Sequence, residues 1–121
     1  LDFVFQEAGI GWIPWMRWRM DDHYLEYTDA VPDLEKLPSE YIDDSFYFAT
    51  QPIGDPQGNN SHIADIIRMA GPENIVYSAD LPHMDFDPPE ELFNQIVGEL
   101  DPDEVRAIMG ETAADLFDLP V

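Results

Sequence analysis

The stretch Ile75-Val76-Tyr77-Ser78-Ala79-Asp80-Leu81-Pro82-His83 decides the fold class. Its first five residues are mostly β-branched or aromatic and lack polar alternation, which predicts a strand buried on both faces of a parallel sheet. Asp80 ends this strand directly, and Pro82 stiffens the chain behind it. In parallel α/β folds ligands bind at the carboxyl ends of strands, so Asp80 occupies a position where chemistry is expected.

Two further runs, Phe3–Phe5 and Phe46–Thr50, have the same buried character as Ile75–Ala79. Segments with helical periodicity lie between the runs and after the last one. This alternation predicts the α/β class, as a doubly wound sheet or a (β/α) barrel with three parallel strands. The strand that ends at Asp80 is expected to be the last of the three.

Capping residues and apolar spacing predict the helices. They are expected at Pro14 to about Tyr27, at Ser39–Asp43 as a short turn, at Ser61–Ala70, after the N-caps Asp87 and Asp101, and at Thr112–Leu119 as a last turn. Gly110 is expected to end the helix that Asp101 begins. The positions expected to be buried include Trp15, Trp18, Met20 and Leu25 in the first helix, Ile63, Ile66, Ile67 and Ala70 in the third, and Leu92, Phe93, Ile96, Val97 and Leu100 later.

Polar residues follow each predicted strand, and three of them, Asp80, Glu7 and His83, have both a functional and a structural interpretation. Asp80 either binds a cation and takes a proton from metal-bound water, or caps the turn that follows. Glu7 is either a general acid or base, or pairs with an arginine such as Arg17. His83 is either a ligand or pocket residue, or an ordinary loop histidine. Thr50 and Gln51 end the second strand.

Other chemistry-bearing residues are expected to be structural. Trp12, Trp15 and Trp18 suit core and loop packing, and His23 and His62 lie on helical segments, where surface positions are expected. The Gly-, Pro- and Asn-rich loop Gln51–Ser61 follows a strand, where a barrel places its functional loops. The sequence contains neither a Gly-rich phosphate loop nor a nucleophile elbow.

Acidic residues dominate the charge. Twenty-six Asp and Glu face five Lys and Arg, for a net charge of −21, and Lys36 is the single lysine. The acids are dispersed, which predicts a salt-adapted, halophilic, cytoplasmic protein whose repelling surface is screened by salt. The competing hypothesis is a nucleic-acid mimic or a binder of basic partners. Direct binding to nucleic acid is not expected, because phosphate contacts need Lys and Arg.

The composition lacks two features, and each absence excludes a class of protein or site. There is no cysteine, and therefore neither a disulfide nor a thiolate metal site. No apolar run approaches the roughly 20 residues that span a bilayer, so no membrane association is expected. The chain begins Leu1-Asp2-Phe3, without Met or a signal-like basic region, and we expect the protein to start earlier.

Several motifs resemble the amidohydrolase 2 family, which includes aminocarboxymuconate semialdehyde decarboxylase and related hydrolases. They occur in family order along essentially the whole chain: Glu7-Ala8-Gly9-Ile10-Gly11-Trp12-Ile13-Pro14, Trp18-Arg19-Met20-Asp21, Leu37–Ile42 leading into Phe46–Pro52, Ser78–His83 with Asp85-Phe86-Asp87, and Ile108–Phe117. The resemblance implies that residues 1–121 are one segment, the C-terminal portion of a (β/α)8 TIM barrel with strands six to eight. It also implies that Asp80 is a metal ligand, for a divalent cation such as Zn²⁺.

The resemblance further implies what the remaining site contains. The family's His-x-His (or Glu-x-His) pair and another histidine would lie upstream of Leu1, so the segment alone is expected to be inactive. Glu7 stands at the position that matches a catalytic histidine of the decarboxylase members, Ala79 precedes the metal-ligand aspartate, and Thr112 replaces the family's usual Asn. Glu7 and Asp80 are therefore expected as catalytic residues, with His83 and Trp12 lining the substrate pocket.

Three hypotheses for function remain open at this point. The first is part of a metal-dependent hydrolase that acts on a small carboxylate- or carbonyl-containing substrate with metal-activated water. The second is a metal-dependent decarboxylase of the same family. The third, of another class, is a non-catalytic remnant or one subunit of a split barrel, completed by the same or a partner chain. A homo-oligomer is compatible with all three, and an upstream His-x-His in the same reading frame would distinguish an enzyme fragment from a remnant.

Overall fold

The computed structural model describes residues 1–54 and 61–120, and these contain one three-stranded sheet in the order β1-β2-β3. Both pairings are parallel, with Phe3 opposite Phe46 and Phe48 opposite Ile75. The predicted parallel sheet, with the strand before Asp80 last, is therefore confirmed. The strands are β1 (Phe3–Phe5), β2 (Phe46–Ala49) and β3 (Ile75–Val76).

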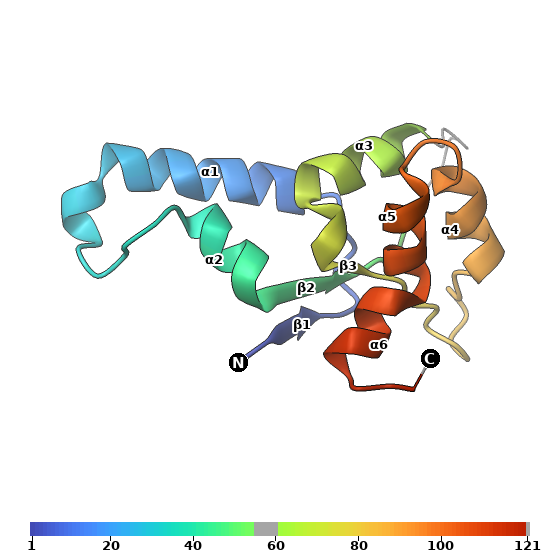
Figure 1. Ribbon diagram of the computed structural model, residues 1–121. Helices are drawn as coiled ribbons and strands as arrows, with labels where there is room; N and C mark the ends of the chain where they lie inside the picture. The colour runs from blue at the N-terminus through green and yellow to red at the C-terminus, as the bar shows by residue number, and fades with distance from the viewer. Residues whose placement is uncertain (55–60, 121) are drawn as a thin grey trace.

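Helices connect and follow the strands. They are α1 (Ile13–Glu26), η1 (Thr28–Ala30), α2 (Pro38–Ser45), α3 (Ser61–Ala70), η2 (Pro72–Asn74), α4 (Pro89–Ile96), α5 (Pro102–Arg106), the π-helical turn η3 (Ala107–Glu111) and α6 (Thr112–Leu116). The helices α1 and α3 run along one side of the sheet, while α4, α5 and α6 gather at the end of the molecule remote from the loop after α1 (Figure 1). The helix positions agree with the sequence prediction, and the backbone of Gly110 is non-helical (φ 177°, ψ −35°), so the helix that Asp101 begins is interrupted at Gly110 as predicted, before α6.

The hydrophobic core lies between the sheet and the helices. Ile67 of α3 and Ile75 of β3 are completely buried, and so are Leu92 and Ile96 of α4. The predicted apolar face of α3 is confirmed, because Ile63, Ile67 and Ala70 are buried and Ile66 packs against them. This core fixes β3, and with it the position of the chain that follows β3.

The strands differ from the prediction at both edges of the sheet. Phe3 and Phe5 were expected to be buried but are 48% and 40% exposed, because β1 pairs only with β2 among the described residues. The third strand was expected to reach Ala79 but leaves the ladder after Val76. The Tyr77 N–H bonds the carbonyl oxygen of Ile108 instead, at 2.9 Å.

The predicted buried positions were also partly wrong. Trp15, Trp18 and Leu25 are 57%, 73% and 69% exposed, because α1 buries the opposite face, with Ile13 in the core and Met20 packed against it. Phe93 and Val97 are likewise exposed, beside the buried Leu92, Ile96 and Leu100.

The remaining expectations concern loops and membrane association. Of the loop predicted at Gln51–Ser61, residues 55–60 lie outside the described part of the chain. Among the described residues, no helix combines the length and apolar character that crossing a bilayer requires.

Candidate metal centre

The carboxyl ends of the three parallel strands lie at one edge of the sheet. Glu7 follows β1, Gln51 follows β2, and Asp80 follows β3 after a short extended segment. Because parallel strands all end at the same edge, residues far apart in sequence meet there. The fold therefore places the predicted acids next to each other, although 73 positions separate Glu7 from Asp80 in the sequence.

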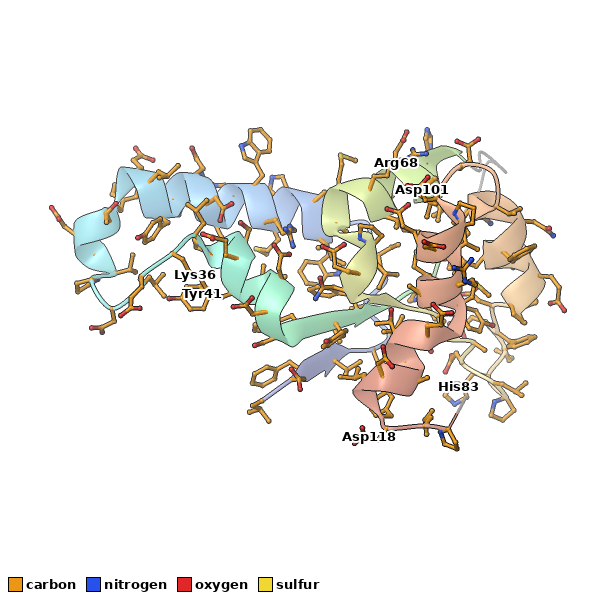
Figure 2. The ribbon with its side chains drawn as sticks, viewed as in Figure 1. Lys36, Tyr41, Arg68, His83, Asp101 and Asp118 are labelled. Atoms are coloured by element: carbon orange, nitrogen blue, oxygen red, sulfur yellow. The ribbon has the colours of Figure 1, made fainter. Side chains whose placement is uncertain are left out.

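Glu7, Asp80 and His83 form a cluster in which each residue offers one ligand atom within 4.8 Å of the others. The Asp80 side chain is 15% exposed, whereas that of His83 is 64% exposed. His83 Nδ1 lies 3.0 Å from Asp80 Oδ1 and 3.1 Å from Oδ2. Figure 2 shows His83 on the loop between β3 and α4. Asp80 is thus the inner member of the cluster, and Glu7 and His83 approach it from the surface.

Both carboxylate residues of the cluster have left-handed backbone. Glu7 has φ 55° and Asp80 has φ 57°, a region that residues other than glycine rarely occupy. After Asp80 the chain turns sharply, and the His83 N–H donates to the Asp80 carbonyl oxygen at 2.8 Å. Such conformations concentrate at functional sites, where the surrounding structure maintains them. The structure at Asp80 therefore fits both interpretations of this residue, as the cap of the turn that follows and as a ligand of a cation.

The loop after β1 is tied to the loop after β2. The Gly9 N–H donates to the Gln51 carbonyl oxygen at 3.2 Å, and a Cβ on Gly9 would lie 2.9 Å from the Pro52 carbonyl oxygen. The indole of Trp12 donates to the Gly9 carbonyl oxygen at 3.0 Å. These contacts hold the segment that carries Glu7 against the end of β2.

Trp12 itself lies away from the carboxylate cluster. Its ring packs edge-on against Phe5 and Phe48 and lines an apolar groove. None of Glu7, Asp80 and His83 lines that groove. The cluster therefore contains three of the four predicted site residues, and the role of Trp12 in a substrate pocket stays a prediction.

Gln51 is a site residue that sequence reasoning did not select. The residue is 3% exposed, and its Nε2 lies 3.3 Å from Asp80 Oδ2 and 3.5 Å from Asp85 Oδ2. Its position directly after a buried strand could have suggested a place in the site. A glutamine at that position does not by itself predict a role, because the sequence does not show which residue faces it.

Tyr77 and Asp87 brace the loop that carries Asp80. The Tyr77 hydroxyl donates to the Asp87 carbonyl oxygen at 2.6 Å, and the Asp87 N–H donates to the Ala79 carbonyl oxygen at 3.0 Å. Burial raises the pKa of Tyr77, and the carboxylates of Asp87 and Glu90 raise this pKa further. The phenol therefore keeps its proton and remains a donor to the loop.

Alternative interpretations from the sequence can now be compared with the structure. Arg17 binds the carboxylate of Asp43, so the suggestion that it pairs with Glu7 is wrong. His23 and His62 are exposed, as predicted, and lie on α1 and α3. The carboxylate of Glu7 instead lies near Asp80 and His83, as a role in the candidate metal centre requires.

The donor set suits a divalent cation. Two carboxylates and one imidazole are ligands that Zn²⁺ accepts at close range, and carboxylates also suit harder cations. The three donors already lie within 4.8 Å of one another. The residues present therefore fit a metal ion at this edge of the sheet.

A parallel α/β sheet with convergent carboxylates at the carboxyl ends of its strands defines a class of proteins that bind ligands at this edge. Within that class, the chain belongs to the amidohydrolase family, Amidohydro_2, which matches residues 1–119. Members of this family are enzymes with a TIM-barrel fold that usually use a divalent metal ion.

A solved structure supports the same family. The chain is similar to 5-carboxyvanillate decarboxylase LigW from Sphingomonas paucimobilis, with 26% sequence identity and a TM-score of 0.67. The similarity covers 99% of this chain but only 34% of the decarboxylase, so the chain spans about a third of that protein's length. No curated protein sequence matches the chain significantly.

Proposed function

We propose that this chain is the C-terminal portion of a metal-dependent enzyme of the amidohydrolase family that hydrolyses a small carboxylate- or carbonyl-containing substrate. The observation that carries the proposal is the convergence of Glu7, Asp80 and His83 at the carboxyl edge of the sheet. In the proposed enzyme Asp80 is the ligand that this chain supplies to a divalent cation, with Zn²⁺ as the first candidate. Further ligands come from the part of the barrel that this chain does not span.

The three clustered side chains have separate roles in this proposal. A bound cation would lower the pKa of a water molecule or polarise a carboxylate or carbonyl group of the substrate. Asp80, the least exposed of the three, would hold the cation and accept the proton that the attacking water loses. Glu7 would receive that proton from Asp80 and pass it to the leaving group, so that one proton moves from the water to the product. His83, exposed at the rim, donates its Nδ1–H to the Asp80 carboxylate and offers Nε2 to the substrate as a hydrogen-bond acceptor.

Metal content and turnover in the whole protein, as its gene encodes it, test the proposal. Purified protein is analysed for bound metal and assayed against a panel of small esters, amides and lactones, with and without a chelator. Asp80→Ala is expected to lose metal and activity together. Asp29→Ala, which removes an exposed acid on the remote turn η1, is the matched control and is expected to keep both. Retention of metal and activity by Asp80→Ala would contradict the proposal.

Decarboxylation is a second candidate, because the similar solved structure is a decarboxylase. The two reactions differ in their products, since decarboxylation releases CO2 and hydrolysis adds water to the substrate. The whole protein is therefore incubated with 5-carboxyvanillate and related aromatic acids, and CO2 release is measured. Metal-dependent CO2 release would favour decarboxylation, whereas turnover of an ester, amide or lactone without CO2 favours hydrolysis. The carboxylate of Glu7, where decarboxylase members have histidine, weighs toward hydrolysis.

The same proposal explains why strand β1 lies at an uncovered edge of the sheet. An apolar groove of about 390 Å³ lies beside β1, between the sheet and the helices α1 and α2, and its lining includes Phe5, Met16, Met20 and Tyr41. Phe3 and Phe5 are half exposed along the same strand. We propose that the preceding strand and helix of the barrel cover this edge and groove, from the same polypeptide rather than a partner chain.

Thiol labelling tests that coverage, because this chain has no cysteine. A cysteine introduced as Met20→Cys lies in the groove, and one introduced as Trp18→Cys lies on the exposed side of the same helix. In the whole protein the thiol at position 20 is expected to react much more slowly with Ellman's reagent than in the 121-residue chain. The thiol at position 18 is expected to react equally fast in both. Equal reactivity at position 20 in the two proteins would contradict the proposed coverage.

A further inference from the structure

Gln51 places a buried carboxamide between two carboxylates. The residue follows β2 and is 3% exposed, and its Nε2 lies 3.3 Å from Asp80 Oδ2 and 3.5 Å from Asp85 Oδ2. A carboxamide nitrogen carries two hydrogens, enough for one bond to each carboxylate. Gln51 thus contacts Asp80, the least exposed member of the candidate metal centre.

The backbone around Gln51 is held from both neighbouring strands. Its carbonyl oxygen accepts the Gly9 N–H of the loop after β1. The preceding residue, Thr50, is completely buried, its N–H donates to the Val76 carbonyl oxygen, and its Oγ1 accepts the Ser78 N–H at 3.1 Å. The amide that reaches Asp80 is therefore fixed relative to β1 and β3 together.

We propose that Gln51 is a positioning residue that sets the orientation of the Asp80 carboxylate for cation binding. The carboxylate can rotate about its terminal bond, and a hydrogen bond from a fixed donor removes that freedom before a cation arrives. The donor is a neutral amide, so it orients the carboxylate without cancelling the negative charge that attracts a cation. An Arg or Lys in its place would form an ion pair and compete with the cation. This inference rests on the proposed metal-binding role of Asp80.

A purely structural role for Gln51 predicts a different result. A buried glutamine that only fills space would affect the stability of the metal-free protein and would leave the coordination of a bound cation unchanged. A positioning role predicts a specific loss of cation affinity and a change in coordination, because a ligand without its hydrogen-bonding partner samples more orientations.

Zn²⁺ binding to the whole protein distinguishes these roles, measured by competition with a chromophoric chelator. Gln51→Met keeps the length of the side chain and removes the donor, and it is expected to weaken Zn²⁺ binding by about tenfold or more. Gln95→Met is the matched control, because Gln95 is also a buried glutamine, on α4, and its Oε1 has no hydrogen-bonding partner within the described residues. The control is expected to bind Zn²⁺ like the unmodified protein.

Two further variants keep the test decisive. Gln51→Asn retains an amide but is one methylene too short to span the contact, so it should weaken binding even if Gln51→Met fails to fold. Asp80→Ala tests the ligand itself. The visible spectrum of bound Co²⁺ is recorded for each variant that binds it and is expected to change in the Gln51 variants but not in Gln95→Met.

The outcomes separate this inference from the proposed function. If Asp80→Ala leaves Zn²⁺ affinity unchanged, the proposed metal role fails and the inference fails with it. If Asp80→Ala abolishes binding while the Gln51 variants match the unmodified protein in affinity and Co²⁺ spectrum, only the positioning role is overturned. An equal loss of affinity in Gln51→Met and Gln95→Met would also overturn it, because the effect would then be one of packing.

Discussion

At the scale of single residues, the candidate metal centre depends on unusual backbone next to ordinary strands. Glu7 and Asp80 both have positive φ, and Gly9 has φ 59° two residues after Glu7. The Gly9 N–H bonds the end of β2, and the space where a Cβ would stand is taken by the Pro52 carbonyl oxygen. Gly9 is therefore required for the close approach of the segment that carries Glu7 to the end of β2.

Substitution of Gly9 tests this close approach. Gly9→Ala is expected to lower the free energy of unfolding by about 1–3 kcal/mol, because it adds both left-handed backbone strain and a contact of 2.9 Å to Pro52. Gly11→Ala is the control, since Gly11 has no neighbour within 4 Å of its Cβ position. Denaturant unfolding measures both. An equal effect of the two substitutions would show that the contact at Gly9 does not hold the loop.

At the scale of elements, two similar helix starts behave differently. Asp101 and Glu104 form a capping box at the start of α5, where the Glu104 carboxylate accepts the Asp101 N–H at 2.9 Å. Asp87 was also expected to cap a helix, but that prediction was wrong. The cap position of α4 is Pro88, and the carboxylate of Asp87 accepts the Ile53 N–H at 3.0 Å instead.

The capping box gives a prediction for α5. Glu104→Ala is expected to lower the free energy of unfolding by about 1 kcal/mol, because it removes the carboxylate that accepts the Asp101 N–H at the start of α5. Asp22→Ala, which removes an exposed ion pair with Arg19 on α1, is expected to change it by less than about 0.5 kcal/mol. Thermal and denaturant unfolding compare the two variants. A larger loss for Asp22→Ala would contradict the assignment of the cap.

At the scale of the whole molecule, the acidic charge exceeds what the bases can compensate. All five bases already have acidic partners: Arg17 with Asp43, Arg19 with Asp22, Lys36 with Asp44, Arg68 with Asp65 and Glu99, and Arg106 with Asp103 and Glu111. Lys36 also lies 4.6 Å from the centre of the Tyr41 ring (Figure 2). Most of the 26 acids therefore repel one another without a compensating base.

This excess predicts a strong dependence of stability on salt. The melting temperature is expected to rise steeply between low salt and molar KCl, because the screening length falls to about 3 Å at 1 M. Differential scanning calorimetry over a KCl series measures the effect, with Asp29→Lys and Asp33→Lys together as a charge-reduced variant of smaller salt dependence. A melting temperature that is unchanged across the series would remove the halophilic interpretation.

The proposal that this chain supplies Asp80 alone as a metal ligand also gives a prediction for the isolated 121-residue chain. It is expected to show no metal-dependent turnover and to bind Zn²⁺ more weakly than about 1 μM, or roughly 8 kcal/mol. A catalytic zinc site needs three protein ligands, and the proposed function places the ligands that accompany Asp80 outside this chain. Isothermal titration measures the affinity. A stoichiometric site tighter than this, abolished by Asp80→Ala, would show that the chain completes a metal site of its own.

The sequence by itself determined the features that depend on local chemistry. Buried β-branched and aromatic runs located the strands and their parallel character, and the position of Asp80 after the third run identified the candidate ligand. The tertiary structure decided whatever depends on contacts between distant segments. It brought Glu7 to Asp80, placed the Gln51 amide against Asp80, and exposed Trp15 and Trp18. The physical reason is that periodicity states which residues of an element share a face, whereas the packing of other elements determines which face is buried.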